Sequence, residues 1–355
     1  MEAPLIDWTS RETHVLLNPR LPANERAEIE ALIAAAPRLA AHVWIATSGS
    51  SGQWKVTALS KEAILAAAAA VNRHLGVVRG DAWACVLPTF HVGGLGIHAR
   101  AFLTSSPVVT LAWDPRQFAA QDVAFSALVP AQVRDLVDAR LEAPRALRAI
   151  VVGGGTLDPA LYDEARTLGW PLLPSYGMTE CCSQVATATP ALPELVILDH
   201  LEVEERGGVL AIRGASLLTG YATAEGFVDP KVDGWFVTED FGVVVRQAAG
   251  AGRRLRVEGR RGDFVKIGGE SVDLARLDRI LNGLSRDAAL VAVPDERLGS
   301  VLHLAATVEP GPVAAAFNER VLPYERVRAV HRVPSIPRSP LGKLLRGRLL
   351  EMVRR

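Results

Sequence analysis

Short apolar segments that alternate with helical segments constrain the fold of this chain more than any other feature. Five such segments lie in the first half of the chain, at 83–87, 108–112, 124–129, 149–152 and 171–173. Strands that alternate with helices form mostly parallel sheets whose faces are covered by the helices. Ligands of such sheets bind in loops beyond the carboxyl ends of the strands. The sequence therefore predicts an α/β lobe whose glycine-rich strand-end loops form the binding site.

The pattern changes twice along the chain, which predicts two domains. Residues 1–259 form a large N-terminal domain, and its last part, about 195–259, has short strands and turns typical of a β-rich subdomain. After residue 260, Leu274, Leu277, Leu281 and Leu284 line one face of a helix, and strands are expected at 289–293 and 302–308. With a basic C-terminal helix, residues 260–355 are expected to form a small α+β domain.

Bulk composition favours a small-molecule partner. Lys plus Arg equals Asp plus Glu, with 39 of each, so no net charge attracts nucleic acid or an anionic membrane. No apolar run is long enough to span a membrane, and a cytoplasmic location is expected. The three cysteines lack the spacing of a metal site, which favours buried, reduced thiols.

The strongest local motif follows the apolar run 42–46. Its hydroxyls, glycines and lysine are Thr47, Ser48, Gly49, Ser50, Ser51, Gly52 and Lys55. Hydroxyls and glycine amides so close together can surround phosphate oxygens, while Lys55 supplies positive charge. The motif is not a Walker A loop, because no Gly precedes Lys55 and no Ser or Thr follows it. A helix capped by Ser60 and ending near Gly76 is expected directly after this loop.

A second motif, Ser175, Tyr176, Gly177, Met178, Thr179 and Glu180, follows an apolar strand. If it forms one loop, the ring of Tyr176 can stack on adenine, the Thr179 hydroxyl can contact phosphate and the Glu180 carboxylate can bind Mg²⁺.

Two further residues suit a nucleotide. Both carboxylate oxygens of Asp240 can accept hydrogen bonds from the hydroxyls of a ribose. Lys343 follows Gly342 in a proline-rich loop and can move onto a developing phosphate charge.

The four segments that contain these residues, 47–55, 175–180, 234–240 and 337–343, resemble in this order the adenylate-forming superfamily of acyl-CoA synthetases, adenylation domains and luciferases. A fifth segment, 259–263 followed by 266–270, is similar to the interdomain segment of that superfamily. The resemblance implies an enzyme that activates a carboxylic acid with ATP and Mg²⁺ and transfers the acyl group to coenzyme A. It also implies that the C-terminal domain is mobile.

The resemblance assigns roles residue by residue. It implies that 47–55 hold the pyrophosphate end of ATP, and that Thr179 contacts the α-phosphate. It implies a magnesium ligand at Glu180 and a lysine, Lys343, that stabilises the adenylation transition state. The remaining nucleotide and coenzyme A residues that it implies are Gly153, Gly154, Gly155, Ser175, Tyr176, Gly177, Asp240, Arg260, Gly268 and Gly269. Segment 88–95 matches an acyl-pocket motif, which implies that His91 lies beside the reacting carboxylate.

Four segments, 87–102, 127–136, 149–157 and 174–187, look most like the 2-succinylbenzoate–CoA ligases of menaquinone synthesis. Their substrate is an aromatic dicarboxylate, so one carboxylate reacts and cationic or hydroxyl donors must recognise the other. Arg100, Arg134 and Ser183 are the candidates, although a structural role for either arginine is an equally good interpretation. Another aryl- or acyl-CoA ligase, an adenylation enzyme that loads a carrier-protein thiol, and a non-catalytic nucleotide-binding protein remain alternatives.

Three departures from the superfamily pattern stand out. Trp54 occupies the usual proline position before the loop lysine, and Gly262 lies where a hinge aspartate is common. The stretch before Thr47 is also much shorter than in most relatives. The resemblance is compatible with a homodimer, but the shorter N-terminal stretch means that the dimer contacts of the relatives cannot be assigned to residues of this chain.

Overall fold

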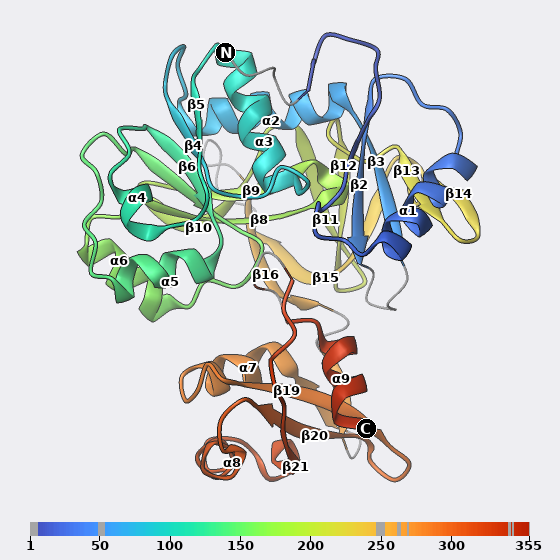
Figure 1. Ribbon diagram of the computed structural model, residues 1–355, viewed down its shortest axis with the longest axis vertical. Coiled ribbons are helices and arrows are strands. Elements are labelled where there is room, and N and C mark those ends of the chain that lie inside the picture. Colours follow the sequence, from blue (N-terminus) through green and yellow to red (C-terminus); the bar gives the residue numbers. More distant parts are fainter. Residues whose placement is uncertain are drawn as a thin grey trace. The chain divides into compact units, whose positions relative to one another are not determined.

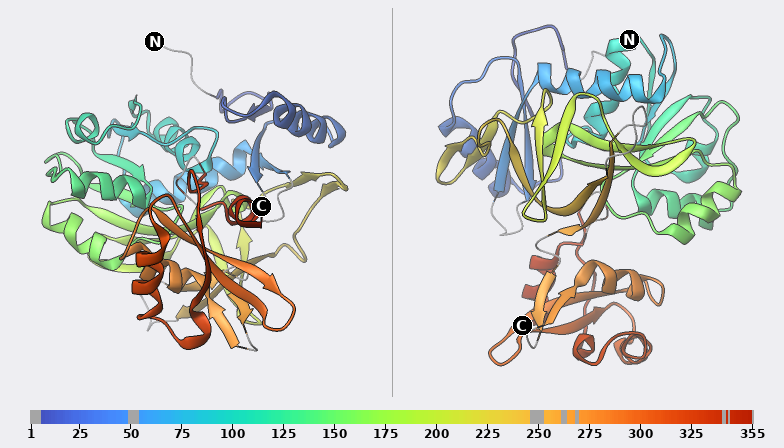
Figure 2. Two further views of the ribbon diagram at one scale, coloured as in Figure 1. Left: turned by 60° about the horizontal axis from the view of Figure 1, so that its bottom comes forward. Right: turned by 180° about the vertical axis from the view of Figure 1, so that it is seen from behind.

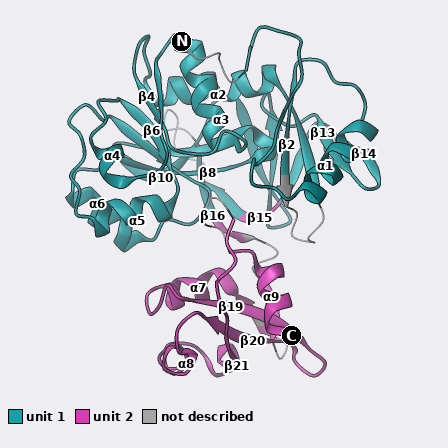
Figure 3. Ribbon diagram, viewed as in Figure 1, with its two compact units in different colours: residues 1–49, 53–238, 242–257 teal, residues 50–52, 239–241, 258–355 magenta. Residues whose placement is uncertain are grey.

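The computed structural model describes residues 6–48, 54–245, 253–260, 264–267, 270–339, 342 and 344–354, without the side chains of residues 47, 48, 260 and 271. The chain forms two compact units (Figure 3). The first comprises residues 1–49, 53–238 and 242–257, and the second comprises 50–52, 239–241 and 258–355.

The larger sheet of the first unit has, within the described residues, the strand order β11-β12-β15-β16-β10-β9-β8-β7-β6-β4-β5. Its strands are β4 (Trp83–Cys85), β5 (Val108–Thr110), β6 (Phe125–Leu128), β7 (Ala149–Val152), β8 (Leu172–Met178), β9 (Ser183–Thr189), β10 (Leu192–Ile197), β11 (Leu201–Arg206), β12 (Val209–Gly214), β15 (Phe236–Val245) and β16 (Arg254–Arg260). Strands β5, β4, β6, β7 and β8 pair in parallel, which confirms the predicted parallel sheet.

Helices cover both faces of the parallel strands (Figure 1). On one face, α4 (Pro115–Ala119), α5 (Pro130–Asp138) and α6 (Pro159–Thr167) form a buried apolar cluster with β4, β6, β7 and β8. On the other face, α2 (Lys61–Leu75) and α3 (Val92–Thr104) contact this sheet, and α2 also contacts the smaller sheet. All four residues of β6 and of β7 are buried, as expected for strands covered on both faces.

The smaller sheet of the first unit has the order β1-β2-β3-β13-β14. Its strands are β1 (His14–Leu16), β2 (His42–Ser48), β3 (Trp54–Ser60), β13 (Gly220–Thr223) and β14 (Gly226–Val228), and α1 (Ala23–Ala35) contacts it. The prediction that a helix directly follows the phosphate loop was wrong, because Val56 to Leu59 are buried as a second hairpin strand. Helix α2 then begins after its cap Ser60 and ends at Gly76 in the left-handed conformation, as predicted.

The second unit has its own sheet and two apolar clusters. The strands are β17 (Phe264–Ile267), β18 (Glu270–Asp273), β19 (Ala288–Asp295), β20 (Gly299–Ala306) and β21 (Val327–Arg332). Helices α7 (Leu274–Asn282) and α8 (Pro310–Asn318) pack on one face of this sheet, and α9 (Arg346–Arg354) packs on the other (Figure 2). Leu274, Leu277 and Leu281 are buried on α7 as predicted, whereas Leu284 lies beyond the end of the helix. The C-terminal helix is confirmed.

Cys85, Cys181 and Cys182 are buried free thiols, as the sequence predicted. Among the described helices, none combines the length and the apolar character needed to cross a membrane.

Candidate active site

The predicted phosphate-binding residues lie at the end of the β2–β3 hairpin. Antiparallel pairing puts Thr47 opposite Lys55 and Ser48 opposite Trp54. Gly49, Ser50, Ser51 and Gly52, which lie between the two strands in the sequence, are outside the described residues, as are the side chains of Thr47 and Ser48. Lys55 is exposed, and its Nζ lies 4.9 Å from the centroid of the Tyr221 ring. The base of the predicted loop is therefore located, whereas phosphate binding by its tip remains a prediction.

The sequence led us to expect that the second motif forms one loop, and this prediction was wrong. Ser175, Tyr176 and Gly177 belong to strand β8, which pairs antiparallel with β9, and only Thr179 and Glu180 lie in the following 3₁₀ turn η1 (Thr179–Cys181). The apolar run that predicted this strand ends at residue 173, whereas β8 continues through polar residues to Met178. A Cβ atom on Gly177 would lie 1.8 Å from the carbonyl oxygen of Ser183, so β9 can approach only a glycine here.

Backbone strain accompanies this close approach. Ser183 has a φ of 128° and Cys182 a φ of 55°, values that residues other than glycine rarely adopt. Strained residues of this kind persist where the surrounding structure fixes them, and they concentrate at binding and catalytic sites. The turn from η1 into β9 is therefore a rigid, specifically shaped part of the candidate site.

Glu180 is held by a residue that the sequence analysis missed. The Tyr221 hydroxyl donates a 2.8 Å hydrogen bond to Glu180 Oε1, and the amide of Leu218 donates a 2.8 Å bond to the Glu180 carbonyl oxygen. Forty-one residues separate Tyr221 from Glu180, so no sequence spacing connects them. The only available signal was that a buried tyrosine hydroxyl usually needs a partner.

The oxygen donors at this turn suit Mg²⁺. Thr179 and Glu180 offer a hydroxyl and a carboxylate, and hard cations prefer oxygen ligands. In the part of the chain that the structure describes, no three His, Cys, Asp or Glu side chains gather into a metal site. A single carboxylate that completes its coordination with phosphate oxygens and water is the usual magnesium arrangement in nucleotide sites.

The predicted glycine segment follows β7. The Gly153 amide bonds to Leu128, and a Cβ on Gly153 would lie 3.7 Å from the carbonyl oxygen of Ser175. Gly154 has a φ of 77°, which favours glycine. The turn formed by Gly153, Gly154 and Gly155 therefore adjoins β8, the strand that carries Tyr176, as a joint adenine site requires.

Helix α3 carries the acyl-pocket motif. His91 is its N-terminal cap residue, and Nε2 of His91 is buried without a hydrogen-bond partner among the described residues. Burial lowers the pKa of His91 below its usual value, so its imidazole is neutral at pH 7. A Cβ on Gly94 would lie 2.4 Å from the carbonyl oxygen of Pro88, so glycine is needed where α3 starts against the segment after β4.

Arg100, on the same helix, is a buried cation. Its exposed fraction is 2%, and Nε and Nη1 have no hydrogen-bond partner within the described part of the chain. Its guanidinium carbon lies 5.4 Å from the centroid of the Trp83 ring, and burial lowers its pKa to about 10. Arg100 Nη2 and Ser183 Cβ both lie within 4 Å of the position that a Cβ on Gly96 would occupy. The structure thus brings Arg100 and Ser183, two of the predicted substrate residues, to the same glycine.

Arg134, the third predicted substrate residue, is engaged elsewhere. Its Nη1 lies 3.2 Å from Glu164 Oε2, which joins α5 to α6. This ion pair favours the structural interpretation of Arg134.

The second unit contains five of the predicted residues outside the phosphate loop, Asp240, Arg260, Gly268, Gly269 and Lys343, and Arg260 ends strand β16. Asp240 is half-buried in β15, and its segment 239–241 clusters with the second unit. The side chain of Arg260 and the residues Gly268, Gly269 and Lys343 lie outside the described residues. Ribose, coenzyme A and transition-state contacts of these residues therefore stay predictions.

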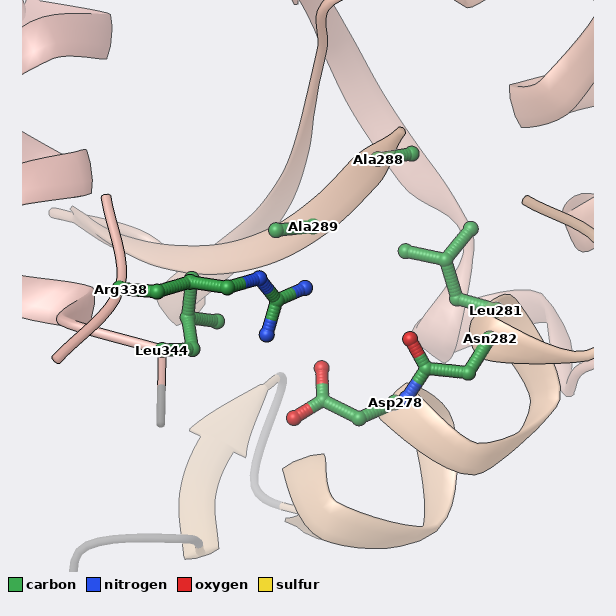
Figure 4. A pocket seen from close by; sticks show the side chains of 7 residues that line it. All are labelled: Asp278, Leu281, Asn282, Ala288, Ala289, Arg338 and Leu344. Carbon is green, nitrogen blue, oxygen red and sulfur yellow. The ribbon is translucent and has the colours of Figure 1, made fainter. Parts of the chain in front are cut away.

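The residues on either side of Lys343 form a closed turn. Arg338 and Leu344 make an antiparallel bridge, Arg338 Nη1 donates a 3.1 Å bond to the Gly342 carbonyl, and the Gly342 amide donates a 2.8 Å bond to Ser339. Arg346 forms an ion pair with Asp278 on α7. Figure 4 shows the Arg338 guanidinium pointing toward Asp278 across a small pocket that Leu281, Asn282, Ala288, Ala289 and Leu344 also line.

Comparison with protein families gives a match over residues 13–222 to the AMP-binding enzymes. Among curated proteins, the 2-succinylbenzoate–CoA ligase of Bacillus licheniformis is 28% identical over 334 residues, which cover 85% of this chain and 68% of that protein. The ligase of the same name from Staphylococcus aureus is 27% identical over 327 residues, with 85% of this chain and 65% of that protein covered. The chain thus spans about two thirds of the length of these relatives.

Among solved structures, the chain is again similar to O-succinylbenzoate coenzyme A synthetases. O-succinylbenzoate coenzyme A synthetase (MenE) from Bacillus subtilis, in complex with ATP and magnesium ion, matches with a TM-score of 0.75 and 25% identity, covering 86% of this chain and 69% of that one. An E. coli MenE variant with bound OSB-AMS matches with a TM-score of 0.76 and 22% identity, covering 95% and 81%. The second likeness concerns the fold alone.

Proposed function

This chain belongs to the family of AMP-binding enzymes and is an adenylate-forming acid–CoA ligase, and we propose that it converts 2-succinylbenzoate to 2-succinylbenzoyl-CoA. ATP, Mg²⁺ and coenzyme A are its cofactor and co-substrates, as in the relatives.

The observation that carries the substrate proposal is the buried guanidinium of Arg100. A buried charge normally has an ionic partner, because desolvation without one is costly. Arg100 forms no salt bridge with any described residue, and two of its nitrogens lack hydrogen-bond partners. A planar guanidinium matches the two oxygens of a carboxylate. The second carboxylate of 2-succinylbenzoate would supply the missing partner, and Ser183 would donate a further hydrogen bond to it.

In the first half-reaction the other substrate carboxylate attacks the α-phosphorus of ATP, the bond to the β-phosphate bridge breaks and pyrophosphate leaves. Such a displacement depends on positioning and charge neutralisation more than on a general base. Segment 47–55 binds the pyrophosphate end, Tyr176 stacks on adenine, and Lys343 stabilises the transition state. Glu180 would hold Mg²⁺, which when bound offsets the negative charge of the phosphates, and Thr179 would contact the α-phosphate.

In the second half-reaction the thiol sulfur of coenzyme A attacks the acyl carbon, AMP leaves and the thiol proton is released. His91, half-buried and neutral, lies at the start of α3 and would border the acyl carbon during this step. Gly268 and Gly269 would contact the pantetheine arm after the C-terminal domain changes its orientation about the segment 260–263.

A substrate panel tests the proposal. The enzyme is offered 2-succinylbenzoate, benzoates and fatty acids with ATP, Mg²⁺ and coenzyme A, and pyrophosphate release is followed. We expect the highest kcat/KM for 2-succinylbenzoate. Replacement Arg100→Met should raise KM for this acid far more than Arg134→Met, because Arg134 already pairs with Glu164. Equal or better turnover of the monocarboxylates by the wild-type enzyme would refute the substrate assignment.

A further inference from the structure

Tyr221 connects two residues that the proposed function uses. Its hydroxyl donates a 2.8 Å hydrogen bond to Glu180, and its ring lies beneath the Lys55 ammonium at 4.9 Å from the centroid. The three side chains come from β13, η1 and β3, so each is supplied by a different element of the first unit.

Tyr221 is fixed by its strand and by the packing of its ring. Tyr221 is paired with Thr57 of β3 on one side and with Val228 of β14 on the other. Its exposed fraction is 6%, and it belongs to an apolar cluster that includes Cys182, with Met178 packed against it. Met178 and Cys182 flank the turn that carries Glu180, so the ring and the turn share one packed core.

The segment before Tyr221 is fixed as well. Lys231 Nζ donates bonds of 2.7 Å and 3.3 Å to the carbonyl oxygens of Leu218 and Thr219. The Leu218 amide in turn bonds to the Glu180 carbonyl oxygen. One short segment therefore holds Glu180 twice, through its backbone and through its carboxylate.

We propose that Tyr221 is a positioning residue for the magnesium and phosphate end of the site, which orients the Glu180 carboxylate through its hydroxyl and the Lys55 ammonium through its ring face. This inference rests on the proposed function, in which Glu180 binds Mg²⁺ and Lys55 binds phosphate. Mg²⁺ requires nearly ideal octahedral geometry, so the rotation of a ligand carboxylate matters. Partners that orient metal ligands typically change metal affinity or activity about 10–100-fold when removed.

The first test measures cation binding without any acid substrate. Mn²⁺, a paramagnetic substitute for Mg²⁺, is titrated into the enzyme with saturating ATP and followed by electron paramagnetic resonance. Tyr221→Phe keeps the ring and removes the hydroxyl, and it should weaken Mn²⁺ binding about 10–100-fold. Tyr162→Phe is the matched control, because the Tyr162 hydroxyl accepts a surface bond from Arg166. Wild-type Mn²⁺ affinity in Tyr221→Phe would overturn the proposal.

A double-mutant cycle separates positioning from a general structural effect. If Tyr221 acts through Glu180, adding Tyr221→Phe to Glu180→Gln should cause less than a twofold further loss of Mn²⁺ affinity. Independent, multiplying losses would contradict the proposal. Tyr221→Leu also removes the ring face, so it should raise KM for ATP beyond the value for Tyr221→Phe by releasing Lys55; equal KM values would refute the role of the ring.

Failure of the proposed function has a different signature. In that case the wild-type enzyme would show no acid-dependent ATP–pyrophosphate exchange with any acid of the panel. The Tyr221 inference fails alone if wild-type exchange is normal and Tyr221→Phe leaves both the Mn²⁺ affinity and the Mg²⁺ dependence of exchange unchanged.

Discussion

Replacing Arg100 by methionine should make the free enzyme more stable while it weakens binding of a dicarboxylate. In the structure the guanidinium is 2% exposed, lacks an acidic partner among the described residues and leaves Nε and Nη1 without hydrogen bonds. Exchanging buried ionic groups for apolar side chains of similar volume often stabilises proteins by about 1–4 kcal/mol. Loss of the contact with Trp83 offsets about 1–2 kcal/mol of this. The expected net change in stability therefore lies between about −1 and about +3 kcal/mol, and the centre of this range is a gain.

Substrate binding should change in the opposite direction. A hydrogen bond to a charged group contributes about 1.5–3 kcal/mol, so loss of the guanidinium should raise KM for 2-succinylbenzoate about 10–150-fold, since 1.4 kcal/mol corresponds to a factor of ten. Turnover of benzoate, which has no second carboxylate, should change less than threefold.

Two assays measure these opposite effects. Thermal unfolding is followed with and without 2-succinylbenzoate, and pyrophosphate release gives KM for both acids. Added dicarboxylate should raise the melting temperature of the wild-type enzyme more than that of Arg100→Met. A variant that is less stable, and whose KM rises equally for 2-succinylbenzoate and for benzoate, would show that Arg100 is a structural residue and would refute the reasoning.

Three further predictions concern other parts of the molecule. Gly177→Ala should prevent folding of the β8–β9 pair or abolish activity, because the new Cβ would lie 1.8 Å from the Ser183 carbonyl oxygen; a stable variant with normal ATP–pyrophosphate exchange would contradict this. Lys343→Ala should lower adenylation about 10²–10³-fold while thioester formation from preformed adenylate survives, and equal loss in both steps would disprove the separation of roles. Burial lowers the pKa of His200 to about 4 and also depresses that of His91, so the unfolded chain binds more protons below pH 6.5. Stability should therefore be complete above pH 6.5 and fall between pH 6.5 and 4 in urea titrations, and His200→Gln should flatten this slope; an unchanged slope would count against burial as the cause.

The parallel strands and the ordered motifs were predictable because each depends on local pattern. Apolar runs such as 149–152 are buried on both faces, and Ser60 and Gly76 bound α2 through short-range backbone chemistry. The same local reasoning failed at Ser175 to Gly177, where a polar sequence continues as strand because β9 pairs with it. Local pattern also gave no sign of the second strand of the β2–β3 hairpin.

The candidate site was predictable in its residue types and less so in its contacts. Glu180 and Lys55 stand out by motif, but the tyrosine between them comes from a distant strand, and only the β3–β13 pairing brings it near. Arg100 and Arg134 were equivalent in the sequence. The ion pair of Arg134 with Glu164 and the burial of Arg100 distinguish them, and both depend on helix packing that the sequence alone does not specify.

Product analysis of a single reaction tests the central claim most directly. The enzyme is incubated with 2-succinylbenzoate, ATP, Mg²⁺ and coenzyme A, and the products are separated, identified and quantified by mass spectrometry. Our account predicts AMP, pyrophosphate and 2-succinylbenzoyl-CoA in equal amounts. Formation of ADP, or an adenylate that reacts with a carrier-protein thiol and not with coenzyme A, would contradict it.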